Sequence, residues 1–144
     1  MGTKPIHFLL VEDDDDHAFL VERALNDNHV SNAVDRVADG EQALAYLRQQ
    51  GEFADKALPD VILLDLKLPK VDGHEVLHEL KDDAGLRTIP VVVLTTSQAE
   101  SDKAKAYYNH ANSYLTKPVD FEKFHQMIKD LKLYWCVWNQ PPAA

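Results

Sequence analysis

The chain carries the run VILLD at residues 61–65, four apolar residues closed by an acid. An apolar run of this length after Pro59 predicts a strand that is buried on both faces. Strands of this kind belong to parallel sheets that helices cover on both sides. The run therefore indicates an α/β fold, and it leaves Asp65 at the carboxyl end of the strand, on the rim of the sheet.

Similar runs alternate with helical patterns along the rest of the chain. Further strands are predicted at residues 6–11, 33–37, 91–95 and 113–115. A helical pattern follows each strand, and Asp15 or Asp16 is expected to cap the first helix. Five strand–helix units predict one doubly wound parallel sheet with right-handed crossovers.

Composition is typical of a small soluble protein. The 144 residues suit one domain, 1–144, and they are 45% hydrophobic and 27% charged. No apolar run approaches the roughly 20 residues that span a bilayer. With a net charge of −9 and no basic cluster, the protein is not expected to bind nucleic acid or anionic membranes. The single cysteine, Cys136, fits a reducing cytoplasm, where we expect the protein.

Polar residues stand at the ends of four of the five predicted strands. They are Glu12 and Asp13 after the first strand, Asp65 on the third, Thr95 on the fourth and Lys117 after the fifth. In doubly wound sheets, functional residues gather beyond the carboxyl ends of the strands, where the strand order reverses. Each residue alone could be an ordinary cap, turn or loop residue. Because all four positions match in order, we expect them to converge on one site.

The predicted convergence has a chemical consequence. Three carboxylates at one place repel one another unless a cation lies between them. A hard divalent ion with oxygen ligands, Mg²⁺ by preference, would remove that repulsion and leave positions for water and a phosphate oxygen. Lys117 would add a positive charge and Thr95 a hydroxyl donor. Asp65 in these surroundings is suited to act as the nucleophile of an in-line phosphoryl transfer.

Five short motifs carry a resemblance to a known family. They are LLVED at residues 9–13, ILLDLKLP at 62–69, DG at 72–73, VLTT at 93–96 and YLTKP at 114–118. With these motifs the chain resembles the CheY-like receiver domain of two-component response regulators, from residue 6 to about residue 131. The resemblance implies a (βα)5 flavodoxin-like receiver fold with strand order 2-1-3-4-5.

The resemblance also implies roles for the residues at the strand ends. Asp65 would accept a phosphoryl group from a sensor histidine kinase, and Lys117 would contact that group. Glu12, Asp13 and Asp65 would hold Mg²⁺ together with the backbone carbonyl of Lys67. The chain would thus be a phosphoacceptor switch, and not an enzyme beyond its own phosphorylation and dephosphorylation.

Thr95 and Tyr114 are implied to form the switch pair. Thr95 would move toward the phosphoryl group, and the Tyr114 ring would turn into the vacated space. This would change the face formed by the fourth helix, the fifth strand and the fifth helix. Within the family, the chain looks similar to the small regulators of cyanobacterial phytochromes, through LKLPK at 66–70 and IPVVVLTTS at 89–97. A phytochrome-type kinase is therefore the implied partner.

An extended aromatic helix and tail are predicted at about 120–144. Apolar side chains recur there three or four residues apart: Phe121, Phe124, Ile128, Leu131, Trp135 and Trp138. Trp and Tyr are favoured at interfaces. We therefore expect a homodimer through Tyr107, Phe121, Tyr134, Trp135 and Trp138. The alternative is that the tail folds back on its own domain. Because no output domain follows, the signal is expected to pass to an unknown downstream protein by contact.

Three other functions are alternatives to the receiver. A dehalogenase-type phosphatase needs a second Asp two residues after the nucleophile, where Lys67 stands. A nucleotide or flavin binder needs a glycine-rich loop after the first strand, where this chain is acidic. A receiver-like scaffold or dimerisation module that works without phosphorylation stays as the alternative. The seven histidines show no metal-ligand spacing and are expected at the surface.

Overall fold

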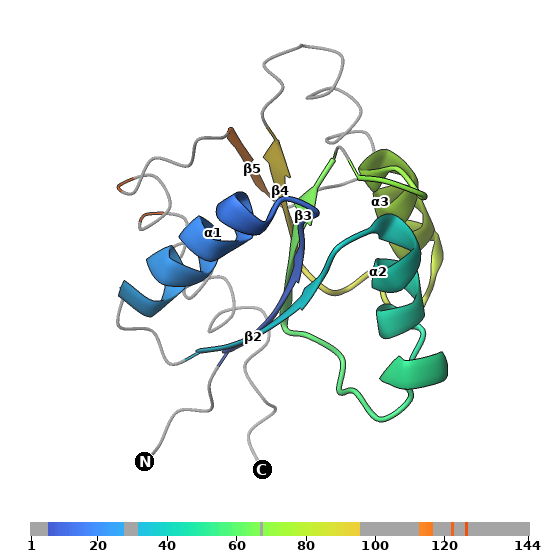
Figure 1. Ribbon diagram of the computed structural model, residues 1–144. Helices are drawn as coiled ribbons and strands as arrows, with labels where there is room; N and C mark the ends of the chain where they lie inside the picture. Colours follow the sequence, from blue (N-terminus) through green and yellow to red (C-terminus); the bar gives the residue numbers. More distant parts are fainter. Residues whose placement is uncertain are drawn as a thin grey trace.

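The computed structural model describes residues 6–27, 32–66, 68–95 and 113–116, together with Glu122 and Gln126. Its elements are, in chain order, β1 (Ile6–Val11), α1 (Asp15–Asp27), β2 (Asn32–Val37), α2 (Gly40–Leu47), the 3₁₀ turn η1 (Gly51–Phe53), β3 (Val61–Asp65), α3 (Gly73–Asp82), β4 (Val91–Thr95) and β5 (Ser113–Thr116). Figure 1 shows α1 on one side of the sheet and α2 with α3 on the other. The described elements thus form three layers.

The strands form one parallel sheet in the order β2-β1-β3-β4-β5. This confirms the predicted doubly wound sheet and its order. Only two strand ends differ, since β2 begins one residue earlier than predicted and β5 ends one residue later. The strand order reverses at β1, because β2 lies on one side of it and β3 on the other. The carboxyl ends of β1 and β3 therefore form the switch point at which such folds place their sites.

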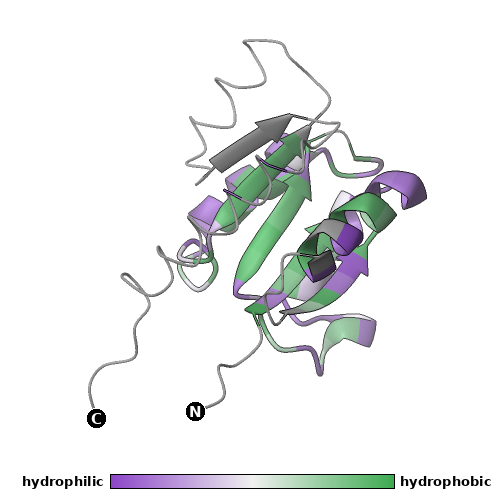
Figure 2. Ribbon diagram, turned by 90° about the vertical axis from the view of Figure 1, so that its left-hand side faces the viewer, coloured by the Kyte–Doolittle hydropathy of each residue, from purple (hydrophilic) through white to green (hydrophobic). Residues whose placement is uncertain are grey.

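Alternate residues of the strands pack into two separate cores. Phe8 and Leu10 of β1 pack on the α1 side, whereas Leu9 and Val11 pack on the side of α2 and α3. All five residues of β3 are buried, as the run VILLD predicted. In Figure 2 the central strands are accordingly hydrophobic along their length. Burial of a large aliphatic side chain stabilises a fold by about 1.5–3 kcal/mol, so the two cores hold the sheet firmly behind its carboxyl edge.

Acidic caps fix the points at which α2 and α3 begin. Asp39 Oδ1 accepts a hydrogen bond from the Gln42 N–H at 2.7 Å, and Asp72 Oδ1 accepts one from the His74 N–H at 2.8 Å. Each cap satisfies a helix N–H that has no partner within the helix, and such a cap is worth about 1 kcal/mol. Both caps lie in loops at the carboxyl edge of the sheet.

Part of the predicted structure lies outside the described residues. This applies to the fourth helix and to most of the C-terminal helix and its tail. Glu122 and Gln126 are helical and exposed, which agrees with a helix predicted from about residue 120. Within the described ranges, no helix combines the length and apolar character that a membrane crossing requires.

Candidate functional site

Three carboxylates meet at the carboxyl edge of the sheet. Each of Glu12, Asp13 and Asp65 offers an oxygen, and these oxygens all lie within 4.8 Å of one another. Glu12 and Asp13 directly follow β1, and Asp65 ends β3. The pairing of Val11 with Leu64 brings Glu12 next to Asp65 across the two strands. The predicted convergence of these residues, called the acid cluster below, is confirmed.

Burial makes the acid cluster costly for the isolated chain. Glu12 is 0% exposed and Asp65 is 5% exposed, whereas Asp13 is exposed. At an effective dielectric constant of about 20, two unit charges 4.8 Å apart repel by about 3 kcal/mol. A polypeptide gains nothing in folding from holding like charges so close. The cluster therefore indicates a positively charged ligand.

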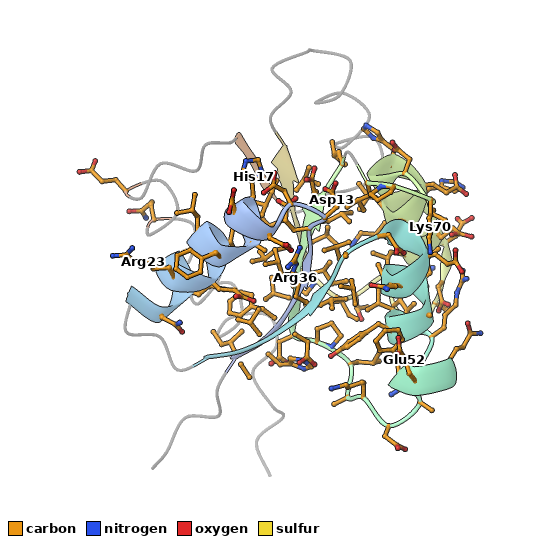
Figure 3. All side chains as sticks on the ribbon, viewed as in Figure 1. Asp13, His17, Arg23, Arg36, Glu52 and Lys70 are labelled. Carbon is orange, nitrogen blue, oxygen red and sulfur yellow. The ribbon has the colours of Figure 1, made fainter. Side chains whose placement is uncertain are left out.

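The donor set decides which cation would fit. Glu12, Asp13 and Asp65 offer carboxylate oxygens, the ligands that hard divalent ions such as Mg²⁺ prefer. His17 of α1 approaches, but its Nδ1 lies 3.9 Å from Glu12 Oε1, in the range of an ion pair. Figure 3 shows Asp13 and His17 at the same edge of the sheet. The described residues thus fit a divalent ion bound through oxygen.

The acids at residues 12–16 have different roles in the structure, and one of them caps α1. Asp14 Oδ1 accepts hydrogen bonds from the Asp16 and His17 N–H groups, at 2.9 Å and 3.1 Å. Asp14 is therefore the cap of α1, and the prediction of Asp15 or Asp16 was wrong. The cap falls one residue earlier because the helix already begins at Asp15. In a run of consecutive acids, the sequence does not identify which side chain accepts hydrogen bonds from the first N–H groups of the helix.

Two glycines let the loops around Asp65 pack closely. A Cβ on Gly73 would lie 2.4 Å from the Asp65 carbonyl oxygen and 2.4 Å from the Leu66 Cα. A Cβ on Gly40 would lie 1.9 Å from the Val71 carbonyl oxygen. The loop after β3 is therefore held between α3 and the start of α2 by backbone contact. This packing fixes the main chain that carries Asp65.

The other predicted site residues are described only in part. Thr95 ends β4 one residue beyond Leu94, the strand partner of Asp65, and it pairs with Thr116 on β5. The backbone of β4 and β5 thus reaches the edge that carries the acid cluster. The side chains of Thr95 and Tyr114 lie outside the described residues, as do Lys67 and Lys117 altogether. The same holds for the predicted dimer residues Tyr107, Phe121, Tyr134, Trp135 and Trp138.

One residue near the site was missed at the level of sequence. Arg36 of β2 donates from Nε to the Glu12 carbonyl oxygen at 3.0 Å and from Nη1 to Asp15 Oδ1 at 2.8 Å. It stands in a weak strand, NAVDRV, whose polar residues gave no sign of which neighbour they meet. The alternation of the strand could have placed it on the α1 side, but could not have identified its partners.

The chain is similar to known proteins over almost its whole length. Residues 8–129 match the family model of the response regulator receiver domain. The chain is 48% identical over 139 residues to the probable methanogenesis regulatory protein FilR2 of Methanothrix harundinacea, which covers 96% of this chain and 89% of that protein. It is 41% identical over 143 residues to the response regulator Rcp1 of Synechocystis, which covers 99% and 97% of the two chains.

Two solved structures resemble the chain in fold and in sequence. The phosphorylated cyanobacterial phytochrome response regulator RcpA matches with a TM-score of 0.80 at 42% identity, over 97% of this chain and 98% of that one. The Mn²⁺-bound form of Rcp1 matches with a TM-score of 0.80 at 41% identity, over 96% and 100%. One of these relatives thus carries a phosphoryl group, and the other carries a divalent ion.

Proposed function

The chain belongs to the response regulator receiver family, and from this membership we propose that it is a phosphorylation switch of a two-component system. Asp65 accepts a phosphoryl group from a sensor histidine kinase, and Glu12, Asp13 and Asp65 bind Mg²⁺, assisted by the backbone carbonyl of Lys67. The observation that carries the proposal is the acid cluster, with three carboxylates within 4.8 Å at the switch point of the sheet. The residues 1–144 form one receiver domain in this proposal.

Asp65 is placed to act as a nucleophile. Asp65 ends a buried strand, and the close approach of Gly73 fixes the main chain that carries its carboxylate. In the transfer, an Asp65 oxygen attacks the phosphorus of a phosphohistidine, the P–N bond breaks and an acyl phosphate forms. Glu12, Asp13 and Asp65 would hold a divalent ion, which would supply positive charge to offset the carboxylates and the incoming phosphoryl group. Lys117 and Thr95 contact the remaining oxygens in this proposal.

The output of the switch is a change of surface. Thr95 and Tyr114 transmit phosphorylation to the face formed by the fourth helix, β5 and the C-terminal helix. A homodimer through Tyr107, Phe121, Tyr134, Trp135 and Trp138 uses this face. Because Rcp1 and RcpA are regulators and RcpA is a phytochrome response regulator, a phytochrome-type kinase is the proposed partner. The protein acts in the cytoplasm and passes its signal to a downstream protein.

Incubation with acetyl phosphate and Mg²⁺ tests the phosphoacceptor directly. Intact mass spectrometry should show a gain of one phosphoryl group that EDTA prevents and Asp65→Asn abolishes. Asp60→Asn is the matched control, because Asp60 precedes the same strand and bonds to the His7 N–H away from the acid cluster. A wild-type protein that gains no mass would contradict the proposal. It would leave the phosphorylation-independent scaffold as the function.

A further inference from the structure

Arg36 ties the loop of the acid cluster to the neighbouring strand β2. It pairs with Leu10, whose side chain packs on the α1 side of the sheet. From this side its Nε donates to the Glu12 carbonyl oxygen at 3.0 Å, and its Nη1 donates to Asp15 Oδ1 at 2.8 Å. Figure 3 shows Arg36 between β2 and the turn that leads into α1, near Asp13.

Both peptide groups of Glu12 are held by consecutive residues of β2. The Glu12 N–H donates to the Val37 carbonyl oxygen at 3.1 Å, and the Glu12 carbonyl accepts from Arg36. The first bond continues the backbone pairing of β1 with β2, but the second depends on one side chain. The residue pairing of β1 with β2 ends at Val11. The Arg36 side chain therefore supplies the next hydrogen bond between the two segments, to the Glu12 carbonyl.

The two bonds of Arg36 differ in their surroundings. The bond to the Glu12 carbonyl is partly buried, whereas the bond to Asp15 is exposed, and the Asp15 side chain is 90% exposed. Exposed ion pairs contribute little, while groups that orient metal ligands commonly change metal affinity by 10–100-fold when removed. The bond from Nε to the carbonyl is therefore the one that matters for the acid cluster.

We propose that Arg36 is a positioning residue, which holds the Glu12 backbone so that the acid cluster is preorganised for a divalent ion. The inference rests on the proposed function, since it assumes that the cluster binds the ion. Without Arg36, the repulsion among Glu12, Asp13 and Asp65 pushes the loop outward, and metal binding must first bring it back. Part of the binding free energy is then spent on ordering the loop.

The direction in which metal affinity changes when Arg36 is removed distinguishes a positioning role from a purely electrostatic one. As a mere positive charge near a cation site, Arg36 would oppose metal binding, and its removal would tighten binding. As a positioning residue it favours binding, and its removal weakens binding. Lysine is informative here because it keeps the charge but has a methylene group in place of Nε and lacks the rigid fork of arginine.

Calorimetric titration with Mg²⁺ of the full chain and its variants tests the proposal. We expect Arg36→Ala to raise the dissociation constant about tenfold, and Arg36→Lys to raise it at least as much, because lysine keeps the charge but lacks Nε. Arg48→Ala is the matched control, because Arg48 pairs with Glu79 on the α2–α3 side and its removal changes the net charge equally. Its dissociation constant should stay within about twofold of the wild type.

A second readout excludes general damage to the fold. Melting temperatures in EDTA show whether each variant folds, and Arg36→Lys serves if Arg36→Ala does not fold. In phosphorylation by acetyl phosphate, the Arg36 variants should need more Mg²⁺ for half-maximal rate, while the rate at saturating Mg²⁺ stays within about twofold.

Each outcome decides one question. If the wild type binds Mg²⁺ and both Arg36 variants bind it as tightly or more tightly, Arg36 has no positioning role. If the wild type binds no Mg²⁺ or Mn²⁺, the metal site of the proposed function fails, and the role of Arg36 toward it fails as well.

Discussion

Two neighbouring residues of β2 contact two regions whose carboxylates have opposite surroundings. Arg36 points toward α1 and supports the acid cluster, whereas Asp35 points toward α2 and joins a second group, the tyrosine cluster of His7, Asp35, Tyr46 and Lys56. In the acid cluster, three carboxylates lie within 4.8 Å. In the tyrosine cluster, a single carboxylate has donors close to one of its oxygens.

The tyrosine cluster brings three donors to one oxygen of its acid. The Tyr46 hydroxyl donates to Asp35 Oδ2 at 2.5 Å, His7 Nε2 lies 3.3 Å from the same oxygen, and Lys56 Nζ lies 3.9 Å from it. The hydrogen bond from Tyr46 lowers the pKa of Asp35 below its ordinary value, and His7 and Lys56 add to this. Burial, followed by the hydrogen bond to Asp35, raises the pKa of Tyr46 above its ordinary value.

The comparison indicates that the tyrosine cluster contributes to stability, whereas the acid cluster serves function. Opposite partners in the tyrosine cluster favour the folded state, so this region holds β1, β2 and α2 together. The mutual repulsion of the three carboxylates in the acid cluster opposes the folded state, and a bound cation would reduce it. The acid cluster is therefore kept in place by the backbone, through the close approach of Gly73 and the two bonds to the Glu12 peptide groups.

The largest expected effect comes from disturbing that backbone. Gly73→Ala should lower the free energy of unfolding by about 3 kcal/mol, because its Cβ would meet the Asp65 carbonyl oxygen and the Leu66 Cα, which can move only with the chain. Urea denaturation followed by circular dichroism measures the change. Gly85→Ala is the control, since its Cβ would lie 3.4 Å from the half-buried Asp83 side chain, an ordinary contact distance, and it should change stability by less than about 0.5 kcal/mol.

Equal effects of the two substitutions would show that the loop after β3 can yield. The acid cluster would then not be held by backbone packing, and the claim that the backbone keeps it in place would be wrong.

The next largest expected effect is stabilisation by Mg²⁺, which should depend on the acid cluster and not on the tyrosine cluster. Mg²⁺ at about 100 times its dissociation constant should stabilise the wild type by about 2.7 kcal/mol. Asp13→Asn should remove most of this gain, yet be at least as stable as the wild type in EDTA because one repelling charge is gone. Thermal denaturation with Mg²⁺ and with EDTA measures both. Asp16→Asn, which removes an exposed acid outside the cluster, should keep the gain from Mg²⁺.

A variant Asp13→Asn that is less stable than the wild type in EDTA would contradict the view that the cluster opposes folding. The same holds for a gain from Mg²⁺ that survives the substitution.

The sequence predicts the fold and the acid cluster for different reasons. Apolar runs such as VILLD have one stable arrangement, covered on both faces, so their order along the chain gives the sheet. Glu12, Asp13 and Asp65 could be predicted because the carboxyl ends of neighbouring parallel strands must meet. Both inferences need only the order of the elements and not the direction of any side chain.

The remaining features depend on side-chain directions that no local pattern specifies. The tyrosine cluster joins residues 7, 35, 46 and 56, which meet only after β1, β2 and α2 have packed. His7, expected at the surface, is half-buried in this cluster. Arg36 is a similar case, since a β2 arginine acquires its role only when the β1–α1 loop lies beside it.

Tyr46→Phe tests the stabilising side of the comparison. The Tyr46 side chain is almost fully buried and its hydroxyl contacts Asp35 and His7, so its removal should cost about 1–2 kcal/mol at neutral pH. Urea denaturation of Tyr46→Phe, Asp35→Asn and the double variant forms a cycle. If the hydroxyl acts through Asp35, the double variant loses less than the sum of the two single losses. Additive losses would mean that the tyrosine cluster is not one unit.

The smallest expected effect is the alkaline counterpart of this test. Because the pKa of Tyr46 is raised in the folded state, its contribution is complete below the ordinary tyrosine value of 10.0 and is lost as the pH rises above it. At pH 10.5 the wild type should have lost about 0.8 kcal/mol relative to Tyr46→Phe, compared with their difference at pH 8. Paired urea denaturation at the two pH values measures this change, and the pairing cancels every group that titrates alike in the two proteins. Asp13→Asn should follow the wild type, because the acid cluster contains no group that ionises in this range. A constant difference between the wild type and Tyr46→Phe would mean that the Tyr46 hydroxyl ionises as readily in the folded protein as in the unfolded chain, and that the tyrosine cluster does not hold its proton.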